Sequence, residues 1–206
     1  MDLAVLSLFI PTFFFVSITP GMCMTLALTL GMSVGVRRTM WMMWGELLGV
    51  ATVAIAAVLG VAALMFKYPL AFNVFKLLGG GYLLFIAYQM WMNKGKMAIP
   101  DTLDSNQTLA RSGLFSQGFV TAIANPKGWA FMVSLLPPFI HADQPLTPQL
   151  TLLVSIILVS EFTCMMLYAT GGKSLGLLIS KRQNVQLINR ISATLMSVVA
   201  IWLLIS

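Results

Sequence analysis

The sequence predicts an all-α integral membrane protein with six transmembrane helices, arranged as two inverted three-helix repeats. Three observations support this fold class: the composition, six long apolar segments, and the placement of the basic residues. Of the 206 residues, 59% are apolar and 9% are charged, and the mean hydropathy is +0.92. Soluble domains are about 45–50% apolar and about 25% charged. We therefore expect a single membrane domain over residues 1–206.

The apolar segments cover about residues 4–33, 40–66, 70–92, 113–139, 149–171 and 187–206. Each has the roughly 20 residues that a helix needs to cross about 30 Å of hydrocarbon. None alternates between apolar and polar residues, and a helix satisfies its own backbone groups in lipid, so we expect helices throughout. Because Met1-Asp2 is acidic rather than basic, we expect the first segment to be a span and not a cleaved signal.

The basic residues indicate how the spans are oriented. Nine follow the first, third or fifth segment: Arg37, Arg38, Lys94, Lys96, Arg111, Lys173, Lys181, Arg182 and Arg190. The positive-inside rule places them in the cytoplasm and both termini outside. The polar stretch of about residues 93–112 is then a cytoplasmic loop between repeat one, about 1–92, and repeat two, about 113–206. Three spans per repeat is an odd number, so the repeats are inverted.

The first and fourth segments are interrupted near their middle. Thr19-Pro20-Gly21 breaks the first, and Asn125-Pro126-Lys127 breaks the fourth. Thr and Asn are good N-caps, and Pro suits the first helical position, so each break predicts the start of a second half-helix. Two such N-termini, with Lys127 beside one of them, would form an anion-binding centre near the midplane. The alternative is that both prolines are ordinary kinks.

The only two glutamates, Glu46 and Glu161, lie in the second and fifth segments. A carboxylate at mid-membrane costs about 2.5–3.5 kcal/mol on insertion scales, so such residues usually have a function or a charged partner. We expect them to bind an ammonium group or to carry a coupling proton. The alternative is a packing hydrogen bond or an ion pair with Lys127. With the half-helix ends, they would suit a zwitterionic ligand.

Other residues carry weaker signals. The spacings Gly31–Gly35 and Gly45–Gly49 predict close helix packing. Cys23 and Cys164 are either small core residues or a redox pair. The 15 methionines and the small residues are compatible with a homodimer interface. We expect no metal, no cofactor and no nucleic acid, because no metal-ligand spacing or phosphate loop occurs and twelve basic residues are few.

Several motifs together resemble the LysE/RhtB family of bacterial amino-acid exporters along nearly the whole chain. The strongest is Asn125-Pro126-Lys127 followed by Leu136-Pro137-Pro138-Phe139-Ile140. Other segments are also similar to the family, namely Thr19-Pro20-Gly21, Gly45-Glu46-Leu47-Leu48-Gly49, Leu77-Leu78-Gly79-Gly80-Gly81-Tyr82-Leu83-Leu84, Glu161 with Tyr168-Ala169-Thr170, and Asn189-Arg190-Ile191.

The resemblance implies a transporter and not an enzyme: a multi-pass exporter of an amino acid or a derivative in the bacterial cytoplasmic (inner) membrane. It implies secondary-active transport, driven by a proton or membrane gradient, with alternating access around a midplane site. The expected substrate-binding residues are Thr19, Pro20, Gly21, Asn125, Pro126, Lys127 and Glu161, supported by Glu46 and Tyr168.

The chain departs from the family pattern at two positions. Met22-Cys23 stands where many members have a polar residue, and Val50 stands where many have an acidic one. Glu46, one helical turn before Val50, could substitute for that acid. Two other functions stay open at this point. One is a thiol–disulfide electron conduit using Cys23, although Trp129 occupies the matching position in the second half. The other is a small-solute channel.

Overall fold

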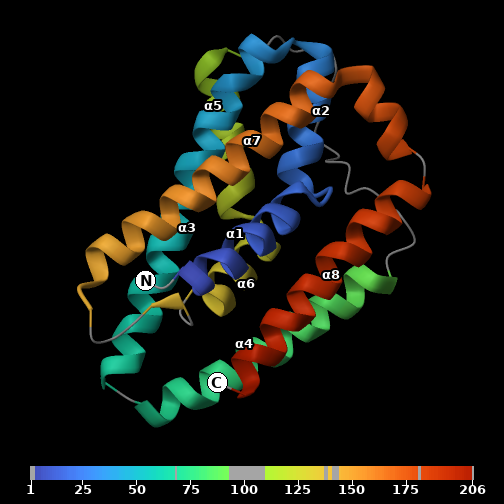
Figure 1. Ribbon diagram of the computed structural model, residues 1–206. Helices are drawn as coiled ribbons and strands as arrows, with labels where there is room; N and C mark the ends of the chain where they lie inside the picture. Colours follow the sequence, from blue (N-terminus) through green and yellow to red (C-terminus); the bar gives the residue numbers. More distant parts are fainter. Residues whose placement is uncertain are drawn as a thin grey trace.

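The computed structural model describes residues 3–67, 69–92, 110–136, 139–140, 144–180 and 182–205, and helices dominate these residues (Figure 1). The helices are α1 (Leu3–Ile18), α2 (Met22–Ser33), α3 (Val36–Lys67), α4 (Pro69–Met92), α5 (Arg111–Ile123), α6 (Pro126–Leu135), α7 (Leu146–Ser180) and α8 (Arg182–Ile205). The predicted all-helical class is confirmed for this part of the chain. Most of the expected loop at 93–112, from residue 93 to 109, lies outside the described residues.

Some of these helices are long and apolar enough to cross a membrane. Within the described ranges they are Val36–Gly60 of α3 and Leu146–Gly172 of α7. Phe9–Ile18 and Met22–Ser33 pass together as one span that is bent by 55°. Helical segments therefore match the predicted membrane protein, whereas the six spans and the inverted repeat stay predictions.

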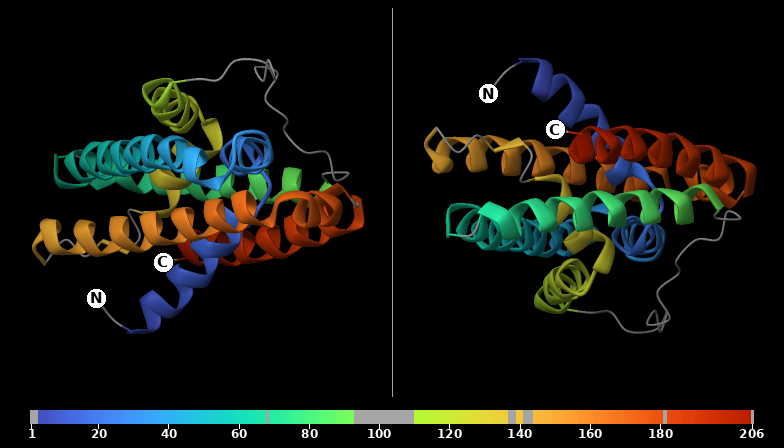
Figure 2. Two further views of the ribbon diagram at one scale, coloured as in Figure 1. Left: turned by 90° about the horizontal axis from the view of Figure 1, so that it is seen from above. Right: turned by 90° about the horizontal axis from the view of Figure 1, so that it is seen from below.

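The helices form two layers that run across the molecule (Figure 2). One layer holds α3 and α4, and the other holds α7 and α8, while α1 and α5 lie toward opposite outer sides. The half-chains interleave, because α5 packs along α3 whereas α1 and α2 pack against α7. The short helices α2 and α6 lie inside, where α2 contacts α3 and α7 and α6 contacts α3 and α4. This arrangement brings both helix breaks to the centre.

Glycines allow α3 and α5 to touch backbone to backbone. A Cβ atom on Gly45 would collide with the carbonyl group of Phe115, and one on Gly118 would collide with that of Met42. At Gly49 an added Cβ would lie 2.7 Å from the Cβ of Ala122. The close packing predicted from Gly45 and Gly49 is confirmed, and small residues at such contacts are what membrane helices use in place of a hydrophobic driving force.

The other predicted glycine pair is only half correct. A Cβ on Gly31 would lie 2.5 Å from the carbonyl oxygen of Ala169 in α7, so Gly31 is a packing residue. Gly35 is exposed, has no neighbour within 4 Å of an added Cβ, and adopts φ +80° in the turn between α2 and α3. Gly35 is needed for the conformation of this turn instead, because only glycine adopts a positive φ without a steric penalty.

The buried side chains form two apolar clusters on either side of the molecular centre. The first is rich in aromatic residues, with the rings of Phe9 and Phe139 4.8 Å apart. The second is rich in methionine and includes Met42, Met43 and Met165. Hydroxyl groups within the helices mostly donate to carbonyls of their own helix, as Thr25 does to Gly21 at 2.7 Å. Ser17 and Ser192 differ, because they donate to groups of other helices.

Candidate functional site

The first break separates α1 from α2 at residues 19–21. The N-cap of α2 is Gly21, with φ −140° and ψ −174° and no side-chain cap. The expectation that Thr19 caps α2 and Pro20 begins it is therefore wrong by two residues. The Thr19 hydroxyl is engaged elsewhere: it donates to the Phe15 carbonyl at 2.7 Å and lies 2.6 Å from the Ser192 hydroxyl of α8. It closes α1 instead of opening α2.

Side chains from the second half of the chain cap the C-terminal end of α1. Ser192 donates to the carbonyl of Phe15 at 2.8 Å. The Lys127 Nζ donates to that of Val16 at 3.4 Å, and the Tyr168 hydroxyl donates to that of Ile18 at 2.8 Å. The last carbonyls of a helix have no partner within the helix and must find one elsewhere. At this break the partners come from α8, α6 and α7.

The second break is built from neighbouring residues. Asn125 is the N-cap of α6, and its side chain accepts a hydrogen bond from the Lys127 backbone amide at 3.1 Å. Pro126 occupies the first helical turn, so the predicted cap is confirmed here. The Trp129 indole donates to the carbonyl of Ile123 at 2.8 Å and closes the end of α5 from within α6. Every one of these contacts spans six residues or fewer.

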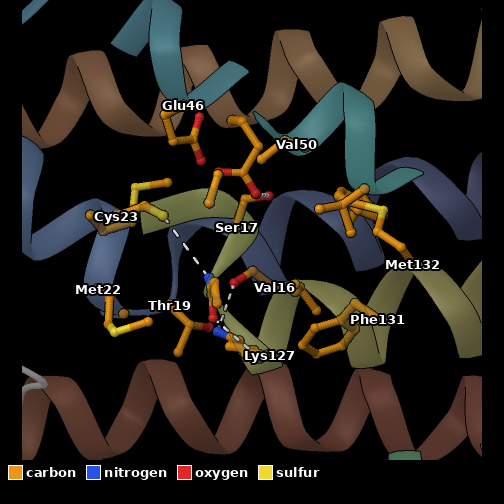
Figure 3. Close-up of a pocket in the computed structure, with 18 residues that line it drawn as sticks. Val16, Ser17, Thr19, Met22, Cys23, Glu46, Val50, Lys127, Phe131 and Met132 are labelled. Carbon is orange, nitrogen blue, oxygen red and sulfur yellow. Dashed lines mark hydrogen bonds between the residues drawn. The ribbon is translucent and has the colours of Figure 1, made fainter. Parts of the chain in front are cut away.

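A small cavity of about 70 Å³ lies between the two breaks (Figure 3). Its polar wall comes from both breaks and from the middles of α3 and α7, and the rest is apolar. The lining residues are Phe13, Val16, Ser17, Thr19, Gly21, Met22, Cys23, Met24, Glu46, Val50, Val53, Ala122, Asn125, Lys127, Gly128, Phe131, Met132 and Glu161. Six of the predicted site residues, namely Thr19, Gly21, Asn125, Lys127, Glu46 and Glu161, therefore share one cavity.

The two carboxylates in this cavity differ in their contacts. Glu161 Oε1 accepts a hydrogen bond from the Ser17 hydroxyl at 2.8 Å. Glu46 is 1% exposed, and its Oε2 has no hydrogen-bond partner among the described residues. A buried polar atom without a partner costs about 1–3 kcal/mol, and more when it is charged. This oxygen is therefore a vacant acceptor at the wall of the cavity.

Lys127 connects the breaks. Its backbone amide belongs to the cap of α6, while its ammonium reaches the carbonyl of Val16 in α1 and lies 5.7 Å from the centre of the Phe131 ring. The described partners of Lys127 Nζ are thus a carbonyl and a ring. The expected alternative of a Lys127–Glu161 ion pair is not among these contacts. The Lys127 ammonium and the carboxylates of Glu46 and Glu161 line the same cavity, and their charges are not neutralised by direct contact.

A larger cavity of about 480 Å³ lies on the other side of the breaks. Thr19, Gly21, Met22, Asn125 and Lys127 line both cavities, so the two breaks form the wall between them. The larger cavity also reaches Pro20 and, further out, Tyr82, Ile86, Gln89 and Met90 of α4 and Asn189 of α8.

Some contributors were not predicted from the sequence. Ser17 and Ser192 hold Glu161 and the end of α1, but each bond joins residues at least 144 positions apart, so no local pattern could reveal them. Tyr168, predicted to support the site, lines neither cavity and donates to the carbonyl of Ile18 beside the first break. Cys23, considered earlier as a redox residue, is a free buried thiol that receives a weak 3.9 Å contact from the Asn125 amide.

The sequence model of LysE type translocators matches residues 14–206. The chain belongs to this family. A homoserine/homoserine lactone efflux protein of Salmonella typhimurium is 26% identical over 183 residues, covering 89% of this chain and 87% of the relative. A leucine efflux protein of Enterobacter sp. (strain 638) is 31% identical over 134 residues, covering 63% and 61%. An uncharacterized membrane protein of Vibrio cholerae is 27% identical over 153 residues, covering 74% and 73%.

No solved structure matches this LysE-type translocator. The relatives are membrane proteins of bacteria, and those named for an activity are efflux proteins. These findings support a membrane transporter of amino acids, and they do not favour the electron conduit or the channel as alternatives.

Proposed function

We propose that this LysE-type translocator exports an amino acid or an amino-acid derivative across the bacterial cytoplasmic membrane by secondary-active transport. One observation supports the proposal above all: two broken helices bring one ammonium and two carboxylates to a single small cavity. A zwitterion carries both signs of charge, and this cavity has a group of opposite sign for each. The named relatives export homoserine, homoserine lactone and leucine, which are small amino compounds.

Each polar group of the cavity has a role in this proposal. The Lys127 ammonium and the positive end of the α6 dipole attract the substrate carboxylate, since a helix N-terminus carries about half a positive charge. Gly21 begins α2 and contributes the matching end from the first half. Glu46 accepts the substrate ammonium at its vacant Oε2 or carries the coupling proton. Glu161, held by Ser17, performs the other of these two tasks.

The apolar part of the cavity limits the substrate side chain. Phe13, Val50, Val53, Phe131 and Met132 line it and offer no polar partner. A second charged group on the substrate would therefore lose its hydration without compensation. We infer a preference for small neutral side chains over charged ones.

The size of the cavity supports alternating access. About 70 Å³ holds only a few waters, whereas ligand pockets usually measure about 300–1,000 Å³. In this proposal the conformation described here does not admit the substrate, and entry requires the wall formed by the breaks to move away from the larger cavity. In this proposal the six spans are α1 with α2, α3, α4, α5 with α6, α7 and α8, with both termini outside and the two halves inverted.

Export can be tested directly in bacterial cells. Cells that carry the wild-type chain, the Lys127→Ala variant or an empty vector are fed dipeptides, which raise internal amino acids, and every amino acid in the medium is quantified. We expect one or a few neutral amino acids to rise with the wild type alone, and the rise to shrink when the pH gradient is collapsed. An unchanged medium, with the protein present in the membrane, would contradict the proposed function.

A further inference from the structure

A groove on the outer side of α3 and α7 lies apart from both cavities of the candidate site. It measures about 620 Å³ and is lined by Trp44, Leu47, Leu48 and Ala51 of α3, Phe115 of α5, and Leu158, Val159, Phe162 and Thr163 of α7. None of these residues lines either of the other cavities. The lining is apolar, and its single hydroxyl, on Thr163, already donates to the carbonyl of Val159 at 2.7 Å.

One end of the groove is marked by aromatic rings and a cation. The rings of Trp44 and Phe162 are stacked with centres 5.8 Å apart. Trp41 lies one turn before Trp44 on α3, and Arg111 lies one turn before Phe115 on α5. The Arg111 guanidinium lies 5.6 Å from the centre of the Trp41 ring. Arg111 does not line the groove, but it places a positive charge one helical turn beyond Phe115, at this end of the groove.

We propose that this groove binds one anionic phospholipid, with an acyl chain along the groove and the phosphate at Arg111. Tryptophan is enriched where membrane meets water, and arginine matches the two oxygens of a phosphate. Basic pockets between membrane helices are known to hold anionic headgroups. Arg37 and Arg38, exposed at the start of α3, add positive charge toward the same end of that helix. The inference does not depend on what the protein transports.

A second copy of the chain suits this groove less well. Burying Arg111 in a dimer interface would require a carboxylate partner, because an unpaired buried charge is strongly unfavourable. A phospholipid supplies the acidic group and the apolar chain in one molecule.

Lipid retention by the purified protein tests the charge at this end of the groove. The protein in detergent is mixed with dioleoyl phosphatidylglycerol or dioleoyl phosphatidylcholine, and bound lipid is measured by native mass spectrometry. We expect about fivefold more phosphatidylglycerol than phosphatidylcholine on the wild type, and equal amounts on Arg111→Gln. The matched control is Arg190→Gln, which removes the same charge from above the Trp91 ring, where Arg190 lies at 5.7 Å. This control keeps the preference, and an equal loss in both variants would overturn the proposal.

A second pair of variants tests the acyl chain and does not alter any charge. Ala51→Phe fills the groove, whereas Ala56→Phe adds the same ring to an exposed position of α3 outside it. We expect Ala51→Phe alone to lose most of the bound phosphatidylglycerol. Wild-type retention in Ala51→Phe would overturn the proposal. So would a dimer mass without lipid that Ala51→Phe converts to a monomer, because a second copy would then occupy the groove. If Arg111→Gln does not elute as one species, the comparison of Ala51→Phe with Ala56→Phe tests the proposal by itself.

Discussion

The two breaks in this molecule occupy matching places in the two halves but are held in different ways. The break between α5 and α6 is closed by Asn125 and Trp129, each bonding within six residues. The break between α1 and α2 lacks a side-chain N-cap, and the end of α1 is closed by Ser192, Lys127 and Tyr168 from the other half. The second break is held mainly by local bonds, whereas the first combines the local bond of Thr19 to Phe15 with bonds from the other half of the chain.

This difference indicates which break moves. A locally capped helix end keeps its geometry when its surroundings shift, because its hydrogen bonds travel with it. The end of α1 keeps its geometry only while α6, α7 and α8 stay in place. We therefore expect the α1 break to rearrange when the small cavity opens and the α6 break to remain a fixed binding element.

The largest expected effect comes from the residue that belongs to both breaks. Lys127→Ala removes the contact with Val16 and the charge beside the cavity, while leaving the backbone amide for the cap of α6. Hydrogen bonds of charged groups contribute about 1.5–3 kcal/mol, so export should fall about 10- to 100-fold at equal membrane abundance. Lys127→Arg, which keeps the charge, is the control. Full export by Lys127→Ala would remove the proposed link between the breaks.

The two carboxylates give the next largest effect. Glu46→Gln and Glu161→Gln should each slow export about tenfold, because a charged acceptor is replaced by a neutral one. Glu161→Gln keeps an acceptor for Ser17, so its melting temperature should stay near that of the wild type. Measuring export with and without a pH gradient identifies the proton carrier as the position whose variant no longer responds. Two fully active variants would contradict both roles.

The cap of α6 should contribute independently of the rest of the protein. Asn125→Ala removes the acceptor for the Lys127 amide, and we expect a loss of about 1 kcal/mol in the free energy of unfolding. Asn125→Asp retains a side-chain oxygen at the N-cap and should recover most of that loss. Thermal unfolding in detergent compares the three proteins. Equal destabilisation by Asn125→Ala and Asn125→Asp would show that the cap is not the stabilising element.

A smaller effect, on the alkylation rate of Cys23, should show which of the two breaks moves. Cys23 lines the small cavity, so its alkylation rate in a Cys164→Ser background reports how often the cavity opens. Tyr168→Phe removes one cap of α1, and at about 0.6 kcal/mol per interhelical hydrogen bond the rate should rise about threefold. Trp129→Phe removes the corresponding bond of the second break and should leave the rate unchanged. The opposite pattern would make α6 the moving element.

The smallest effect is expected for Cys23→Ser. The substitution replaces a thiol with a hydroxyl of similar shape, and the Asn125 amide donates to the thiol over a long 3.9 Å. Export, measured as substrate in the medium, should change less than twofold. An electron conduit would lose all activity, so a complete loss would revive that alternative.

The same contrast explains what the sequence could and could not predict. Asn125 and Pro126 cap and start α6 as expected, because the bonds that matter lie within the motif itself. Thr19 and Pro20 form the same kind of motif and predict a cap that does not form. Ser192, 173 positions away, pairs with the Thr19 hydroxyl, and a contact at that separation leaves no local trace.

The glycines and the two glutamates also show that local features can be predicted from the sequence and tertiary contacts cannot. Gly45 and Gly49 predict packing correctly because their spacing keeps both on one helix face. Gly35 has the same spacing to Gly31, but it lies past the end of α2. Its role there is to adopt the positive φ of the turn and not to pack against a helix. Glu46 and Glu161 could be singled out because a carboxylate in an apolar segment is costly. The shared cavity around them, and the partner Ser17, depend on how six helices meet.

The backbone contact between α3 and α5 also limits how the protein can divide into moving parts. At Gly45 and Gly118 the backbones of α3 and α5 are in direct contact, so these helices cannot slide past each other. The two glycines come from opposite half-chains. α1 and α2 are joined to α7 in the same crossed manner. Neither half-chain can therefore swing as a unit against the other. Each rigid body must combine helices from both halves, so a chain cut between α4 and α5 would yield two fragments that need each other to fold.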